Sequence, residues 1–299
     1  MSFKKKITVL VAIALTIPTF AFADGKKMGW ELELKQLALN LTSTEVHNST
    51  PYKENGVSNA RLTADSQTFI QGKLDFAANQ FSSKLFWSNT LFMEYGKTYV
   101  RPVDEEEVIT ENSDKILIAT DLTYRLWKID NFLGGFEAGP FVNVGYETEF
   151  DAQENSELKK VVRGKAGAKL FEGKYLKQLY AAYVFEADYT PKPGPEVTRD
   201  AFEAGFRVET DIREGVKFVC WSYYRKYLSE SRETITDLDY EAEAEARLDI
   251  KLWNNISVAP FINYYCAAAQ RYNRVADNWY TGISLSYSTF FKKAATVEE

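Results

Sequence analysis

The residue types that carry most enzyme chemistry are scarce in this sequence. The only histidine is His47, which lies in a polar stretch with Asn48, Ser49 and Thr50. A histidine that acts as a general base is usually oriented by a carboxylate, and nothing in the sequence places one against His47. Nucleophile elbows and phosphate-binding glycine loops are also missing from the sequence. We therefore expect His47 to be a solvated loop residue and predict that the protein is not an enzyme.

The sequence also offers few ligands for a metal ion. The two cysteines are Cys220 and Cys266, and together with one histidine they cannot complete a four-ligand zinc site without carboxylates. We predict neither a metal site nor a cofactor. We expect both cysteines to be free thiols in apolar surroundings, with a disulfide as the alternative.

The most distinctive charged residues form two rows in which nearly every second position is charged. They are Glu241, Glu243, Glu245 and Asp249 in the acidic row, and Arg163, Lys165 and Lys169 in the basic row. On a strand, each row lies on one face of the sheet. In an enclosed lumen the acidic row would favour cations or basic solutes, and the two rows could instead close the interior by pairing with each other. A solvated polar face explains the rows equally well.

Alternation of apolar and polar residues predicts the strands that position these rows. From Asp237 to Trp253 the two classes alternate almost without exception, which overrides the helix propensity of the alanines and glutamates. Similar patterns predict twelve strands, near residues 29–46, 59–77, 83–98, 114–128, 132–149, 157–172, 175–189, 199–212, 216–229, 235–253, 256–271 and 278–291.

The connections between these strands alternate in length. Short turns such as Asn254-Asn255 interleave with longer polar loops such as residues 47–58. This sorting is typical of outer-membrane barrels, in which an even number of strands places both termini in the periplasm. We therefore predict an all-β protein, a transmembrane antiparallel up-and-down β-barrel of about twelve strands with periplasmic termini. A soluble sandwich or lipocalin-like barrel is the alternative.

The N-terminal residues predict export. Lys4, Lys5 and Lys6 precede an apolar run from Ile7 to Phe20, and Ala21-Phe22-Ala23 follows as a small-x-small cleavage pattern. The apolar run is too short to remain as a membrane-spanning helix. We predict a signal peptide at residues 1–23 and an outer-membrane barrel domain at 24–299.

Two segments resemble known outer-membrane proteins. Residues 280–287, with Gly282, Leu285 and Tyr287 at the key positions, resemble the signal in the last strand that barrel-insertion machinery recognises, although the strand continues to Phe291. Trp87-Ser88-Asn89-Thr90-Leu91, with Tyr95-Gly96, Ser113-Asp114-Lys115 and Tyr124, resembles outer-membrane barrels of unknown function, including the salt-stress-induced type. The second resemblance covers about a third of the mature chain and implies a barrel without naming a substrate.

Charge and composition narrow the function. The net charge of −6 becomes more negative once the signal peptide and its lysines are removed, and no basic face is present for nucleic acid. The leading expectation is a porin-like channel for small hydrophilic solutes with a charged lumen, in contact with outer-membrane lipid and lipopolysaccharide. The alternative is a non-conducting structural or surface-interaction barrel with a filled lumen.

Overall fold

The computed structural model describes residues 29–55, 59–63, 66–100, 108–129, 135–152, 157–190, 196–231, 237–271 and 274–293. The predicted signal peptide, residues 1–23, lies outside the described residues, and so do parts of several connections.

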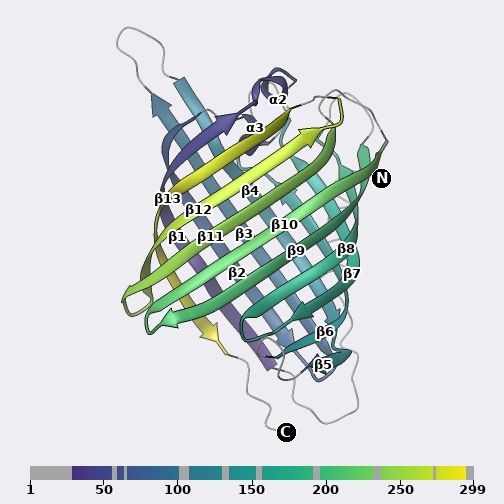
Figure 1. Cartoon of the computed structure of the whole chain (residues 1–299), viewed down its shortest axis with the longest axis vertical. Helices are drawn as coiled ribbons and strands as arrows, with labels where there is room; N and C mark the ends of the chain where they lie inside the picture. The colour runs from purple at the N-terminus through teal and green to yellow at the C-terminus, as the bar shows by residue number, and fades with distance from the viewer. Residues whose placement is uncertain are drawn as a thin grey trace.

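Antiparallel strands close into a barrel (Figure 1). Among the described residues, twelve strands are long and one, β5 (Trp127–Ile129), has three residues. The long strands are β1 (Gly29–His47), β2 (Gln67–Phe81), β3 (Leu85–Val100), β4 (Val108–Tyr124), β6 (Phe136–Thr148), β7 (Lys160–Phe171), β8 (Leu176–Asp188), β9 (Val197–Arg213), β10 (Val216–Glu230), β11 (Leu238–Trp253), β12 (Ile256–Ala269) and β13 (Val275–Lys292). Strand β1 pairs with β13, and β4 pairs with β6 as well as β3, so the wall is continuous. The predicted up-and-down barrel of about twelve strands is confirmed.

The two faces of the wall are inverted in polarity relative to a soluble barrel. Leu37, Leu39 and Leu41 on β1 leave half or more of their surface exposed on the outside, whereas Glu243 and Glu245 on β11 are buried inside. A barrel in water buries its apolar side chains, while a barrel in a bilayer turns them toward lipid. The fold is therefore that of a transmembrane β-barrel.

Aromatic side chains mark both edges of the apolar band. Near one end of the barrel, three pairs of rings lie on the outer faces of neighbouring strands, with centroids 4.3 to 5.8 Å apart. These pairs are Tyr183–Phe202, Tyr224–Tyr240 and Tyr264–Trp279. Near the other end, Trp30, Trp127 and Trp253 are exposed. Two such girdles are expected where a barrel wall crosses the membrane interfaces.

The connections are sorted by length between the two ends, except that the long connection between β4, which ends at Tyr124, and β6, which starts at Phe136, lies at the end with the short turns. The pairing of Leu32 with Lys292 places both ends of the described barrel at one rim, which we call the turn rim. The connections there include Glu214-Gly215 and Asn254-Asn255, where Gly215 and Asn254 adopt positive φ values of 75° and 45°. The connection between β1 and β2 lies at the opposite rim, which we call the loop rim, as predicted (Figure 1).

One predicted strand is wrong in its first part. The segment predicted as a strand near 59–77 begins with helix α3 (Ala60–Thr63), and β2 starts only at Gln67. Helix α2 (Thr50–Glu54) precedes it and starts with Thr50-Pro51, a pair that favours a helix start. In the described part of the chain, no helix is long and apolar enough to cross a membrane.

A β-bulge interrupts the predicted alternation at the start of β11. The register of β11 shifts between Leu238 and Tyr240, so Leu238 packs inside the barrel and not on the outer face with Ala242. A bulge inserts one residue and reverses the side-chain alternation beyond it.

Candidate functional site

The barrel encloses a cavity of about 1060 Å³. Its wall carries charged side chains from β1 to β4, from β6 to β11 and from the connection between β1 and β2, and acidic groups outnumber basic ones. Alternation in each strand points these charges inward, because the outer face is apolar. The cavity is the candidate site for solute binding or passage.

Three members of the predicted acidic row line this cavity. Glu241, Glu243 and Glu245 are all buried on the inner face of β11. Each has a cationic partner from another element: Arg225 binds Glu241, and Lys73 lies 3.2 Å from Glu245. The fourth member, Asp249, is not among the cavity-lining residues and pairs with a neighbour on its own strand. The acidic row is therefore largely neutralised.

The predicted basic row is divided between two places. Arg163 and Lys165 line the cavity, where Arg163 binds Glu147 and Glu186 and Lys165 binds Glu203. Lys169 is buried away from the cavity-lining set and binds Asp121. The acidic and basic rows do not pair with each other; each is matched by charges from other strands.

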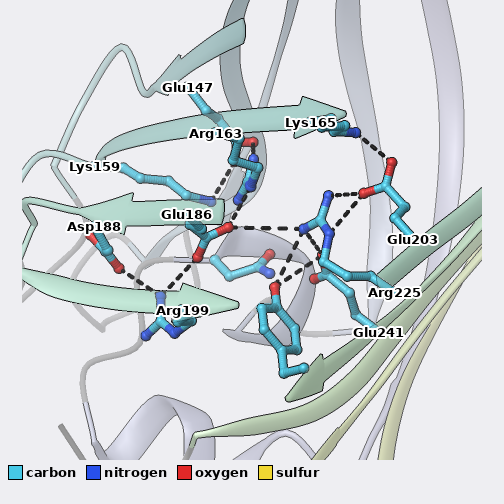
Figure 2. A network of polar contacts seen from close by, with 12 residues as sticks. Glu147, Lys159, Arg163, Lys165, Glu186, Asp188, Arg199, Glu203, Arg225 and Glu241 are labelled. Atoms are coloured by element: carbon cyan, nitrogen blue, oxygen red, sulfur yellow. Dashed lines mark hydrogen bonds and ion pairs between the residues drawn. The ribbon is translucent and has the colours of Figure 1, made fainter. Parts of the chain in front are cut away.

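A continuous ion-pair network covers one side of the lumen (Figure 2). Arg225 lies at its centre, 2.5 Å from Glu203 and in contact with Glu241. Arg199 extends the network with contacts of 2.9 Å to Glu186, 3.2 Å to Asp188 and 2.7 Å to Glu230. Buried charges are costly unless each has several partners, and the forked guanidinium groups supply them. The network holds these long side chains against the wall, beside the cavity.

Aromatic rings narrow the lumen near the turn rim. The ring of Phe86 stacks on Phe81 and Phe171, with centroids 5.0 and 6.0 Å away. Arg125 lies over Phe81 and Phe171 and binds Glu137 and Glu172 at 2.7 and 2.8 Å. We call Phe81, Phe86, Phe171 and Arg125 the turn-rim cluster.

The opposite side of the lumen is neutral and tightly packed. Asn40 donates to Gln71 at 3.0 Å, and Thr44 donates to Asn278 at 2.6 Å. The cavity left there is only about 10 Å³. The open space is therefore off-centre, on the side of β3 to β11.

Arg61 is one of the lumen residues that the sequence prediction missed, as are Arg199 and Arg225. Arg61 lies in the segment predicted as a strand near 59–77, but it extends from α3 into the barrel and lies 3.2 Å from Glu94 and 3.1 Å from Glu243. The Thr50-Pro51 pair was the available signal, since it indicates a helix and therefore a connection longer than predicted.

His47 has acidic neighbours that its sequence surroundings did not predict. Its Nδ1 lies 3.0 Å from Asp277 of β13, and its Nε2 lies 3.4 Å from Glu45. The pairing of β1 with β13 brings Asp277 to His47. The hydrogen bond with Asp277 raises the pKa of His47, which stands beyond the aromatic girdle. Each ring nitrogen therefore faces a carboxylate.

The two cysteines lie on β10 and β12, and the predicted insertion-signal residues lie on β13. Cys220 and Cys266 are free cysteines. Leu285 and Tyr287 face outward on β13, and Gly282 lies opposite Thr42 of β1. Among the described residues, no group of three or more metal-binding side chains is assembled.

Comparison with known proteins yields distant fold likenesses. No family model and no curated protein matches the chain. Outer membrane phospholipase A from Escherichia coli is 11% identical, with 92% of this chain and 96% of that chain covered and a TM-score of 0.43. The translocator domain of the autotransporter NalP from Neisseria meningitidis is 10% identical over 95% of both chains, with a TM-score of 0.36. An anion-selective porin from Comamonas acidovorans is 7% identical, with 87% and 100% covered and a TM-score of 0.34. Likenesses this distant carry no argument about activity.

Proposed function

We propose that the chain is an outer-membrane channel for small hydrophilic solutes. The observation that carries the proposal is the cavity of about 1060 Å³, whose wall is charged while the outer face of the barrel is apolar. Water and polar solutes are stable in such a lumen, and the apolar face is stable against acyl chains.

Planar-bilayer recording of the refolded protein tests this proposal. We expect discrete conductance steps with a preference for cations, because acidic groups outnumber basic ones on the wall. Lys115 lines the cavity, and no ion pair is found for it in the described part of the chain. Lys115 lies opposite Glu94 in the register of β3 and β4, so Lys115→Glu should shift the reversal potential further toward cations, both by reversing its own charge and by leaving Glu94 less neutralised.

Lys84→Glu is the matched control, because it reverses the same charge in an exposed turn outside the cavity. An equal shift in both variants would show that surface charge, and not the lumen, sets selectivity.

The second candidate is a non-conducting barrel with a structural or surface-binding role. The turn-rim cluster favours it, because stacked rings and a paired arginine narrow that end of the lumen. A preparation that migrates as a folded, heat-modifiable barrel and shows no conductance would support this candidate and overturn the channel.

We also propose that the chain is located in the outer membrane. Export by a signal peptide at residues 1–23 and insertion through Gly282, Leu285 and Tyr287 would place both termini in the periplasm, with lipopolysaccharide around the loop rim. Kinship with the salt-stress-induced type of barrel remains a prediction. Fractionation of membranes from an expressing Gram-negative cell tests the location: recovery of the chain in periplasmic extract without detergent would contradict it.

A further inference from the structure

Helices α2 and α3 of the connection between β1 and β2, which we call the β1–β2 segment, are folded into the barrel. Tyr52 of α2 and Leu62 of α3 are almost completely buried, in a cluster with Tyr265, Ala267 and Ala276 from β12 and β13. These contacts anchor the connection inside the loop rim, where Figure 1 shows both short helices. An apolar anchor of this kind holds a segment in place against the entropy of a free loop.

The side chain of Arg61, on α3, extends into the lumen. Its guanidinium binds Glu94 on β3, Glu243 on β11 and, at 2.5 Å, the side-chain oxygen of Asn263 on β12. It also lies 4.5 Å from the ring centre of Tyr280. Its backbone oxygen accepts a hydrogen bond of 2.9 Å from Asn278. A side chain with partners on four strands is held in a single position.

The ion pair between Lys73 and Glu245 spans the lumen beside Arg61. The small cavity of about 10 Å³ is bounded by both cations, which also line the large cavity, and by Ser284, which lines only the small one. Ser284 is buried, and no hydrogen-bond partner is found for its hydroxyl in the described structure. Arg61 and Lys73 thus separate the open cavity from the packed neutral wall.

We propose that the β1–β2 segment is a built-in constriction and that Arg61 determines the selectivity of the lumen. The inference rests on the proposed channel function. The guanidinium masks two carboxylates, Glu94 and Glu243, and occupies the space between them. Its removal uncovers two negative charges, deletes one positive charge and joins the small cavity to the large one.

A thiol placed behind Arg61 tests the constriction without relying on conductance. Ser284→Cys is made in a chain that carries Cys220→Ser and Cys266→Ala, and labelling by a membrane-impermeant maleimide is followed. We expect slow labelling when Arg61 is present and labelling at least about tenfold faster with Arg61→Gln. Leu62→Ala should also accelerate labelling, because it removes the apolar anchor and leaves every charge in place.

Arg199→Gln is the matched control, since it removes one lumen arginine that does not touch the segment. It should leave the labelling rate unchanged. In bilayers, Arg61→Gln should raise both the unit conductance and the cation preference relative to the parent protein.

Labelling tests the constriction, and conductance tests the channel. Equal labelling of Ser284→Cys in all backgrounds would overturn the constriction. Faster labelling in both segment variants, with no conductance in any of them, would support the constriction and reject the channel. Faster labelling with unchanged selectivity would reject Arg61 as the selectivity residue.

Discussion

Lys73 on β2 and Glu245 on β11 form an ion pair of 3.2 Å across the inside of the barrel, although β1, β13 and β12 lie between their strands. Both side chains are mostly shielded from solvent. The pair therefore links two parts of the wall that are not neighbours, through the lumen, where backbone hydrogen bonds do not reach.

Breaking this pair from one side should destabilise the barrel. Lys73→Met leaves the Glu245 carboxylate buried without its partner, which we expect to cost about 2–3 kcal/mol. Urea unfolding in lipid vesicles measures the change. Lys84→Met, the same substitution in an exposed turn, should stay within about 0.5 kcal/mol. Restored stability in the double variant Lys73→Met with Glu245→Leu would identify the unpaired charge as the cause, and an unchanged single variant would contradict it.

The apolar outer face can be tested on one strand. Leu41 and Glu45 both face outward on β1, but Glu45 pairs with Trp279, a girdle residue, and Leu41 pairs with Ile283 inside the apolar band. Leu41→Arg should cost about 2–4 kcal/mol in a bilayer, and Glu45→Arg about 0–1 kcal/mol. Folding yield and unfolding free energy in vesicles give both values. Equal costs at the two positions would argue against the placement of the membrane.

His47 provides a site-specific pH measurement because the chain has no other histidine. The hydrogen bond with Asp277 raises its pKa above the usual value of about 6.5. The stabilising effect of protonated His47 should therefore be complete below about pH 6.5 and disappear as the pH rises through the raised pKa. Titration of the ring carbon resonances in micelles measures the midpoint. Asp277→Asn should lower this midpoint, and an unchanged midpoint would show that Asp277 is not the cause.

Gly282 is required for close contact at the seam between β1 and β13. A Cβ atom at this position would lie 2.2 Å from the backbone oxygen of Leu41, closer than real Cβ contacts. Gly282→Ala should therefore slow folding and lower the fraction of heat-modifiable barrel, whereas Gly164→Ala should have little effect, because open space surrounds that position. Equal folding of both variants in detergent, with a defect only in cells, would assign Gly282 to recognition by the insertion machinery and not to packing.

The barrel was predictable because its signals are local. Alternation in the segment from Asp237 to Trp253 sets the two faces of β11, and the lengths of most connections indicate which end they occupy, although the long connection between β4 and β6 lies at the turn rim. The partners of the charges were not predictable, since Glu245 meets Lys73 across the lumen and Glu243 meets Arg61 from a connection. Such contacts depend on closure of the wall and on the insertion of α3. The alternation of apolar and polar residues along a strand encodes neither of these.

His47 illustrates the same limit at the surface. Asp277 is far away in the chain and reaches His47 only because the first and last strands pair. A sequence pattern limited to neighbouring residues therefore described His47 as a solvated loop residue without its carboxylate partner.

The pairing of Leu32 with Lys292 brings the two ends of the wall together at the turn rim. A peptide linker could therefore join them while a new opening is cut in a connection at the loop rim. Such a circular permutant would keep every neighbouring pair of strands but would end on a different strand. Its assembly in cells would reveal whether biogenesis follows the shape of the finished wall or the order in which its strands are synthesised.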